Sequence, residues 1–499
     1  MPFVIRRVSD PERGSSRMLW KKLAMAVLLC GRPFLHWYWD WKARKAHDHR
    51  INLLKRILLI LIAVLLGLLV FSFLTKSILS IRLLGLHSLL NISGEPAPVD
   101  QYGHTNILLL GQGDETGEDL IDSLIVASLD PASKSAILLS LPRDLYLLKP
   151  NTLEPGKLNS RYRDFKHTLM FKKGLDDDDA SLTAIQELAM EIGRSLNIEI
   201  HHVVKVDFEG FVQAIDAVNG IDIDVPYDII DNEFPGPAYT YEPFEIRAGP
   251  QHLDGTTALK YARSRSTTSD FARSQRQQQL LRALAQQVEV HSLLRDPARI
   301  TRLVSVLKNH IQTTASIQQA IGIGASALHI DLTHIVIMQL HDRNGLYDEV
   351  LHPGGFLYTP PREFFDGASV LLPISTPEFP ISWKQLQTLS AMLFHHRTPY
   401  LQPTTITILN SGAPSGSAAK LAREFIRYGF DIVDTANAPK KRDISVIETS
   451  NPSSPAITLF GKFLNMEIVS STAQEPMTIF LGKNYQYVPF QSLTLPSLP

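Results

Sequence analysis

The stretch NILLLGQGDETGEDLIDSLIVASLDPASKSAILLSLPRD, residues 106–144, decides the fold class. It holds three apolar runs of strand length, at 106–110, 124–129 and 136–141, separated by polar segments. Short apolar runs bounded by Gly, Pro and Asp are typical of buried strands. Apolar residues at helical spacing follow at 180–196, and another strand comes next. Because strands and helices alternate, we predict an α/β domain with a mixed central sheet flanked by helices.

The chain beyond this stretch continues the alternation. We predict a short helix at Glu209–Val218, a turn at Asn219-Gly220, and a half-exposed strand in the alternating IDIDV of 221–225. The acidic run at 176–179 predicts a solvated loop and a helix start rather than a metal site. Residues 291–330 are expected to be mostly helical.

An uncharged apolar run precedes the domain. Residues 57–74 read ILLILIAVLLGLLVFSFL, which is long enough to cross a bilayer as a helix. A buried helix of a soluble core or a cleaved signal peptide fits less well, because the run is apolar all round and a long segment precedes it. We therefore predict one transmembrane helix at 57–75. The Lys and Arg excess in 1–56 predicts that this tail is cytoplasmic and that the rest lies outside the plasma membrane.

A second unit begins near residue 404. The segments TTITILN, a helix at about 418–428, FDIVD and TIFLGKNY predict a small C-terminal α/β module. The expected division after the membrane helix is a linker at 76–100, a domain at 101–375, a linker at 376–402, the module at 403–486 and a tail at 487–499.

Composition excludes several classes of protein. The chain has 499 residues, 49 Lys and Arg against 50 Asp and Glu, and one cysteine, Cys30. A single cysteine forms no internal disulfide, and no Cys/His spacing indicates structural zinc. A net charge of −1 gives no electrostatic footprint for nucleic acid, so we predict no nucleic-acid partner. Any anion site must be local.

Arginines gather in three motifs of the domain. Arg143 and Asp144 stand in SLPRD, just beyond a buried strand, where α/β folds usually place ligand groups. Arg263 and Arg265 in YARSR would leave one face if that segment is extended. In DFARSQRQQ, the side chains at helical spacing after Asp270 are those of Arg273, Arg276 and Gln277. Converging guanidinium groups suit phosphate or pyrophosphate, although separate surface ion pairs would give the same spacing.

Acidic residues lie between the first two strands. Asp114, Asp119 and Asp122 could hold a hard divalent ion such as Mg²⁺, or belong to an ordinary Asp- and Gly-rich loop. The residues alone leave both readings open.

The order of the motifs resembles one known family. NILLLG, DSLIVASLDP, SLPRD, KLN, VKVDFEGF, NGIDIDVP, LDGTTALKYARSR and DFARSQRQQ resemble the LytR-CpsA-Psr family of cell-wall polymer ligases over roughly 106–330. The final module resembles the LytR C-terminal domain in ITILNSG, GSAAKLA, GFDIV and IFLGKNY.

The resemblance implies a membrane-anchored phosphotransferase. Such enzymes move a glycan polymer from a polyprenyl pyrophosphate lipid to peptidoglycan through a phosphodiester, with Mg²⁺ or Mn²⁺. It implies catalytic roles for Arg143, Asp144, Arg263, Arg265 and Asp270, and metal binding by Asp122 and Asp114. It implies pyrophosphate binding by Arg143, Arg263, Arg265, Arg273, Arg276, Gln277, Lys157 and Asn159.

One position departs from the family pattern. Many members have Asp two residues after the first glycine of the opening strand, whereas Gly111-Gln112-Gly113 places glycine there and Asp114 follows. Either Asp114 replaces the usual metal ligand or that ligand is missing. Two other functions stay open: a non-catalytic binding or regulatory protein for wall polymers or their lipid intermediates, and a pyrophosphatase that releases the lipid-linked polymer.

Overall fold

The computed structural model describes most of the chain after residue 95. The described residues are 96–113, 119–148, 153–236, 240–264, 273, 276, 277, 279, 280, 283, 309–328, 330–331, 334–343, 352–374, 382–472 and 476–495. The expected membrane helix, and with it Asp114, Arg265 and Asp270, lie outside these residues. Among the helices that are described, none is both long and apolar enough to cross a membrane.

A mixed six-stranded sheet forms the centre of the first domain, as predicted. Its strands are β1 (Thr105–Gln112), β2 (Ile121–Asp130), β3 (Ser135–Leu141), β6 (His202–Val206), β11 (Ile311–Thr313) and β12 (Ile335–Gln339). The strand order is β11-β6-β1-β2-β3-β12. Strand β1 runs parallel to β6 and antiparallel to β2, and β3 runs antiparallel to β2 and parallel to β12. The three apolar runs quoted above are thus neighbouring buried strands.

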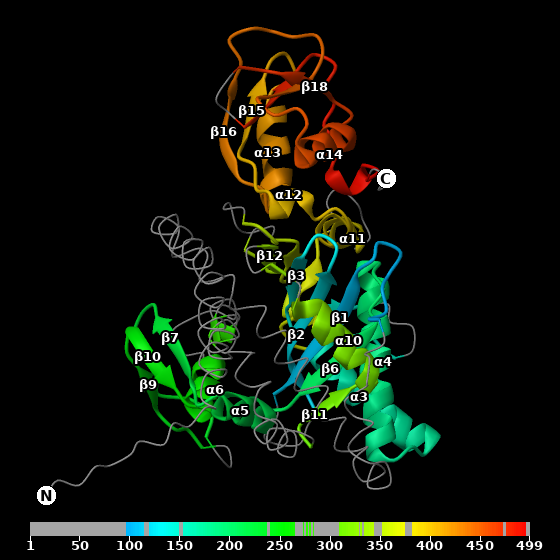
Figure 1. Ribbon diagram of the computed structural model, residues 1–499, viewed down its shortest axis with the longest axis vertical. Coiled ribbons are helices and arrows are strands. Elements are labelled where there is room, and N and C mark those ends of the chain that lie inside the picture. The colour runs from blue at the N-terminus through cyan, green and yellow to red at the C-terminus, as the bar shows by residue number, and fades with distance from the viewer. Residues whose placement is uncertain are drawn as a thin grey trace, which may run out of the picture. The chain divides into compact units, whose positions relative to one another are not determined.

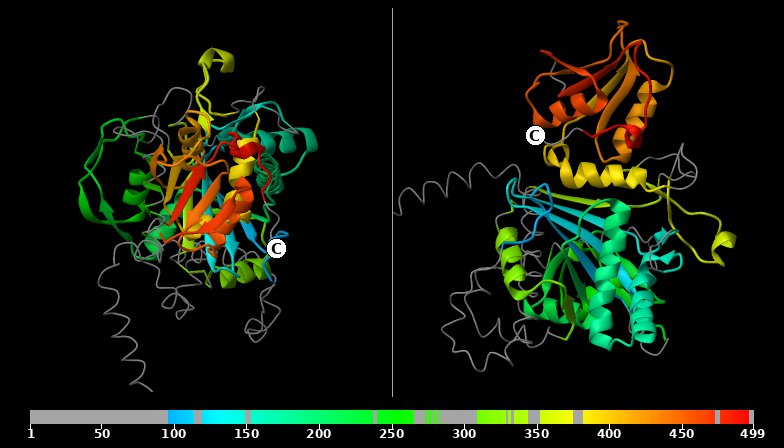
Figure 2. Two further views of the ribbon diagram at one scale, coloured as in Figure 1. Left: turned by 90° about the horizontal axis from the view of Figure 1, so that it is seen from above. Right: turned by 90° about the vertical axis from the view of Figure 1, so that its right-hand side faces the viewer.

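Helices cover both faces of this sheet (Figure 1). On one face, α3 (Leu158–Lys173) and α4 (Asp177–Leu196) pack in one apolar cluster with Leu108 and Leu110 of β1. On the other face, α5 (Phe208–Ala217), α6 (Gly255–Arg263) and α10 (Ile317–Leu328) surround Ile107. Figure 2 (right) shows α3 and α4 in front of the strands. Neighbouring residues of β1 therefore point into different cores, as expected from strand geometry.

The acidic run forms the start of α4, as predicted. The Asp176 side chain accepts a hydrogen bond from the backbone N–H of Asp179 at 2.9 Å, and three aspartates occupy the first turn. Carboxylates stabilise a helix N-terminus because the backbone N–H groups there carry partial positive charge. The helix ends at Asn197, which has φ 55° and caps the last turn.

A β-bulge interrupts the pairing of β1 with β2. Gly111 lies opposite Ser123, and Gln112 lies opposite Ile121, so Asp122 has no pairing partner on β1. An extra residue of this kind twists the strand and redirects its side chain.

Short two-stranded pairs and one turn of 3₁₀ helix complete the first domain. They are β4 (Tyr146–Leu147) with β5 (Gly156–Lys157), β7 (Ile221–Val225) with β10 (Gly249–Leu253), β8 (Ile229–Asp231) with β9 (Phe244–Ile246), β13 (Leu357–Tyr358) with β14 (Leu372–Pro373), and η4 (Arg362–Phe365). The exposed and buried residues of β7 alternate as predicted.

Two local expectations need correction. Arg263 is the last residue of α6, so YARSR does not begin as an extended segment; Ala258 and Tyr261 are buried against the second core and hold the helix there. Residues 291–330 are not uniformly helical, because Ile311–Thr313 pairs with β6 as β11.

The stretch 376–402, expected to be a linker, contains packed helices. They are α11 (Lys384–Ser390), a π-helical turn (Ala391–His395) and α12 (Thr398–Leu401). Leu386, Leu389 and Phe394 are buried.

The C-terminal module is an α/β unit, as predicted. Its strands are β15 (Ile406–Asn410), β16 (Ile432–Asn437), β17 (Val446–Thr449), β18 (Glu467–Ser470) and β19 (Met477–Leu481), in the order β16-β15-β19-β17-β18. Helices α13 (Ser417–Arg427) and α14 (Pro455–Leu464) pack on it through Phe425 and Phe460, whose rings meet edge to face at 5.3 Å. A 3₁₀ turn, η6 (Phe490–Ser492), follows.

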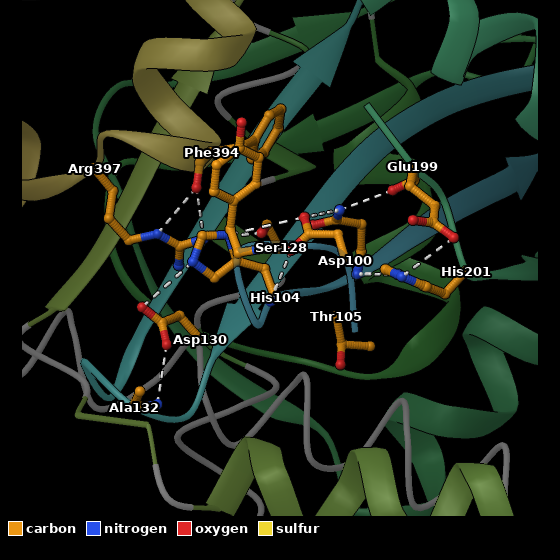
Figure 3. A network of polar contacts seen from close by, with 12 residues as sticks. Asp100, His104, Thr105, Ser128, Asp130, Ala132, Glu199, His201, Phe394 and Arg397 are labelled. Atoms are coloured by element: carbon orange, nitrogen blue, oxygen red, sulfur yellow. Dashed lines mark hydrogen bonds and ion pairs between the residues drawn. The ribbon is translucent and has the colours of Figure 1, made fainter. Parts of the chain in front are cut away.

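A buried polar network lies at the sheet end where β2 finishes and β3 starts, which we call the sealed end (Figure 3). The guanidinium of Arg397 is 4% exposed and donates to the hydroxyls of Ser128 and Ser135, each at 3.0 Å. His104 lies 3.6 Å from the Asp130 carboxylate. Burial raises the pKa of Asp130, but hydrogen bonds from His104 and Ser133 and the charge of Arg397 outweigh it, so that pKa lies below its usual value.

Candidate functional site

The opposite end of the sheet, which we call the open end, gathers most of the described candidate residues. The C-terminal ends of β1, β3 and β6 meet there with the start of β2. Arg143, just beyond β3, donates through Nη1 to Oδ1 of Asp122 at 2.7 Å. The two side chains are 18% and 30% exposed. A half-buried ion pair of this kind can still be reached by a ligand.

Lys157 and Asn159 of the KLN motif hold the residues just beyond β3, Arg143 and Asp144, in place. The backbone N–H of Asn159 donates to the Arg143 carbonyl at 3.0 Å, and Lys157 Nζ lies 2.9 Å from Oδ1 of Asp144. Oδ2 of the same aspartate lies 3.7 Å from Nε of Arg143. Lys157, Asp144 and Arg143 therefore form one charged row beside Asp122.

Gln277 reaches the open end from the segment after α6. The Ser123 hydroxyl donates to Oε1 of Gln277 at 3.2 Å. Because Ser123 follows Asp122 on β2, Gln277 lies close to the Asp122–Arg143 pair.

Aromatic rings support the Arg263 guanidinium. It lies 4.5 Å from the centre of the Phe208 ring and 5.3 Å from that of Phe234. Phe208 begins α5 two residues after β6 ends, which places Arg263 at the open end. A guanidinium on aromatic faces keeps its N–H donors for other partners.

Arg273 and Arg276 are both buried, at 8% and 3% exposure. Arg276 donates through Nε to the carbonyl of Tyr261 at 2.9 Å and also donates to the carbonyl of Ser264. These bonds satisfy backbone carbonyls at the end of α6. Arg276 thus stabilises the helix end that carries Arg263.

Of the two carboxylates expected to bind a metal, Asp122 is described and Asp114 lies outside the described residues. Among the described positions, no group of three or more His, Cys, Asp or Glu side chains could hold a metal. A Cβ atom built on Gly113 would lie 2.1 Å from Oδ2 of Asp122, so the carboxylate occupies the space that an aspartate at 113 would need. Mg²⁺ often takes only one or two protein carboxylates and completes its shell with substrate phosphates and water. Asp122 fits that pattern, and the bare glycine leaves room for it.

A buried network beneath the open end was missed at the sequence level. Lys205 on β6 donates to Oε1 of Gln112 at 2.7 Å and to the hydroxyl of Tyr162 at 2.8 Å. Gln112 donates to Asp119 at 2.9 Å, and Asp119 accepts from Lys166 at 2.8 Å. A single lysine within the apolar run VVKV was the available signal.

Burial and charge shift the pKa values of this network. Burial lowers the pKa of Lys205 to about 8, although Asp119 acts in the other direction. Burial raises the pKa of Tyr162 to about 12. Burial lowers the pKa of Lys166, but hydrogen bonds to Asp119 and Asp177 outweigh this and keep it above its usual value.

The open end of the mixed sheet joins Asp122 to the charged row of Arg143, Asp144 and Lys157, which defines an α/β domain with a partly exposed charged site. The chain belongs to the LytR_cpsA_psr family, which matches residues 87–352, more than half of its length. Residues 403–485 match the family described as LytR cell envelope-related transcriptional attenuator.

Two curated relatives bear related names. The chain is 32% identical over 206 residues to the polyisoprenyl-teichoic acid–peptidoglycan teichoic acid transferase TagV of Bacillus subtilis, covering 40% of this chain and 46% of that protein. It is 29% identical over 211 residues to TagU of Oceanobacillus iheyensis, covering 42% and 58%. The match thus spans about half the length of these relatives.

Two solved structures match at lower sequence identity. The crystal structure of B. subtilis TagV has 24% identity and a TM-score of 0.40, covering 58% of this chain and 97% of that one. The LytR-Csp2A-Psr enzyme from Actinomyces oris has 18% identity and a TM-score of 0.39, covering 60% and 96%.

Proposed function

We propose that the protein is a membrane-anchored phosphotransferase that joins a polyprenyl-pyrophosphate-linked glycan polymer to peptidoglycan through a phosphodiester. The observation that carries the proposal is the Asp122–Arg143 pair at 2.7 Å, half-buried at the open end beside Lys157, Asp144 and Gln277. The names of the curated relatives, teichoic acid transferases, support the substrate class.

The reaction needs charge neutralisation and positioning more than covalent chemistry. A hydroxyl of the acceptor sugar attacks the phosphorus that carries the polymer. The new phosphorus–oxygen bond forms as the bond to the bridging oxygen breaks, and polyprenyl phosphate leaves. The hydroxyl proton passes to a base, for which we propose Asp144 or Asp270.

The arginines would bind the pyrophosphate. Arg143 can exchange its bond to Asp122 for phosphate oxygens. The rings of Phe208 and Phe234 support Arg263, which would contact the same anion. We propose that Arg265, Arg273 and Gln277 complete the pocket. Arg276, Lys157 and Asn159 would orient these groups.

We propose that Asp122 holds Mg²⁺ or Mn²⁺ together with phosphate oxygens of the substrate, with Asp114 as a further ligand. The ion would supply positive charge that offsets the charge developing on the leaving phosphate. The space that Gly113 leaves beside the Asp122 carboxylate supports this role.

The expected anchor fits a lipid-linked substrate. We propose a single transmembrane helix at 57–75 with a cytoplasmic N-terminus and the active domain outside the plasma membrane. Enzyme and lipid would then meet at one membrane surface.

A transfer assay tests the function. The full-length protein in detergent is mixed with a short lipid-pyrophosphate glycan, a peptidoglycan fragment and Mg²⁺, and products are measured by mass spectrometry. We expect a phosphodiester-linked product that requires both acceptor and Arg143. Release of free polymer phosphate without acceptor would instead identify a pyrophosphatase.

Gly113 favours one rival function, a non-catalytic binding or regulatory protein. The glycine removes a carboxylate that many family members have, and the remaining Asp122 is already paired with Arg143. In that case the protein would bind the lipid-linked glycan, binding would weaken in Arg143→Ala, and only intact lipid would be recovered.

A further inference from the structure

The buried lysine beneath the open end does more than fill the core. Lys205 is 8% exposed and lies in the β6 strand that neighbours β1, opposite Leu110. Its ammonium group lies 4.4 Å from the centre of the Tyr162 ring. Burying a charged group is costly unless its hydrogen bonds are satisfied, so the partners of Lys205 are the reason that it is tolerated.

Those partners lead directly to the bulge. Lys205 donates to the side-chain amide oxygen (Oε1) of Gln112 at 2.7 Å, and the side-chain amide nitrogen (Nε2) of Gln112 donates to Asp119 at 2.9 Å. Asp119 is also held by Lys166 at 2.8 Å. Gln112 ends β1 and Asp119 lies just before β2, so this chain of bonds joins the two strands across the bulge.

The backbone at the bulge lacks regular strand pairing. Asp122 lacks a pairing partner on β1, and the neighbouring backbone bond runs from Gly113 N–H to the Leu120 carbonyl at 3.0 Å. The position of the Asp122 carboxylate therefore depends on how firmly the flanking residues are fixed. Gln112 lies on β1 opposite Ile121, next to the bulge, and Asp119 lies three residues before Asp122.

We propose that Lys205 is a positioning residue for the transfer reaction: through Gln112 and Asp119 it fixes the bulge, and with it the Asp122–Arg143 pair that receives the pyrophosphate. Lys205 itself does not touch the substrate. This inference rests on the proposed function and adds a residue to it.

The charged groups that face Lys205 come from several elements. They are Asp119 before β2, Lys166 of α3, Asp177 of α4 and Asp207 after β6, with the Tyr162 phenol in direct contact. Since burial lowers the pKa of Lys205 to about 8, its charge is lost on the alkaline side of neutrality. The charge-assisted bond to Gln112 weakens there, so transfer should decline as pH rises through that pKa.

The experiment compares full-length protein in detergent with Lys205→Met and Gln112→Leu. Transfer is followed across pH, and binding of inorganic pyrophosphate is measured by calorimetry. We expect either substitution to lower transfer by about 10- to 100-fold, as for other residues that orient ligand groups, and to remove the alkaline decline. Pyrophosphate binding should weaken in both. Because the two residues act in one chain, the double variant should be no worse than the worse single variant.

Tyr162→Phe is the matched control. It removes the other hydrogen-bond partner of Lys205 and leaves the bond to Gln112, so transfer should be unchanged even if stability falls. A folded Lys205→Met protein with wild-type transfer and the wild-type pH profile would overturn the inference and leave the function intact. If wild type transfers nothing, the function fails, and pyrophosphate binding decides: equal binding by wild type and Lys205→Met overturns the inference.

Discussion

The two ends of the central sheet each place an arginine near an aspartate of β2. At the open end, Arg143 bonds Asp122 directly at 2.7 Å, and both side chains remain partly exposed. At the sealed end, Arg397 is 4% exposed, and its bonds go to Ser128 and Ser135 while its charge acts on Asp130 (Figure 3). Residue type is therefore no guide to role at these two ends.

What separates them is access. The Arg397 donors meet hydroxyl and carbonyl acceptors from three segments of the chain, including the Phe394 carbonyl at 3.0 Å. Arg143 is more exposed, at 18%, and it bonds the Asp122 carboxylate, which a phosphate can replace. The sealed end should thus govern stability, and the open end should govern ligand binding and transfer.

The largest expected effect is on stability, from Arg397→Met. The change leaves Ser128, Ser135 and the Asp130 charge without their buried partner, so the free energy of unfolding should fall by about 3–5 kcal/mol. Chemical denaturation measures it. The control is Arg423→Met, since Arg423 is exposed on α13. A loss no greater than that of the control would mean that the sealed end is not a stability element.

The next effect is on activity, from Arg143→Met. Loss of a preorganised charged donor should reduce transfer by roughly 10²- to 10³-fold. The unfolding free energy should change by less than about 1 kcal/mol, because the pair is partly exposed. Arg163→Met is the control, because Arg163 pairs with Asp164 at 2.9 Å on α3 and is similarly half-buried. If both variants transfer alike, Arg143 has no special role.

A smaller effect is expected from Gly113→Ala. The new Cβ would lie 2.1 Å from the Asp122 carboxylate and must displace it from Arg143. We expect a stability cost of about 1–3 kcal/mol and reduced transfer. Gly156→Ala is the matched control, since its nearest atom would lie at 3.7 Å. Normal transfer by a folded Gly113→Ala protein would contradict the importance of the pair.

The smallest effect is a pH dependence of stability at the sealed end. His202 begins β6 and is buried, and burial lowers its pKa from 6.5 to about 4. Between pH 6.5 and about pH 4, His202 is protonated in the unfolded chain but neutral in the folded chain. The free energy of unfolding therefore falls as pH drops through this range. Urea denaturation at pH 7 and pH 5 should differ by roughly 2 kcal/mol through this residue. The difference should shrink in His202→Leu; an unchanged difference would exclude His202 as its source.

Local patterns predicted the first three strands and several later elements. Strands β1, β2 and β3 and helix α4 follow from apolar spacing and capping residues, which act within a few residues of the chain. The helical start of YARSR did not follow, because Arg263 ends a helix that the burial of Tyr261 holds against the second core.

The site was predicted in part. Arg143 bonds Asp122, and Gln277 accepts a hydrogen bond from the neighbouring Ser123, although spacing alone could not show that these motifs converge. Spacing could not predict contacts between residues that are far apart in the sequence: Arg397 bonds Ser135 and Ser128 at separations of 262 and 269 residues. The Lys205 network depends likewise on the packing of α3 against β6, which no local pattern encodes.

The bulge determines what a single deletion would do to the sheet and to the site of this chain. Asp122 is the residue within the β1–β2 pairing that has no counterpart on β1, so deleting it would bring Ile121 and Ser123 into adjacent, regular pairing positions. The fold would lose an irregularity, and the site would lose its carboxylate. The loss of a single codon would thus leave the strand order, the sealed end and the C-terminal module in place and remove the carboxylate that bonds Arg143.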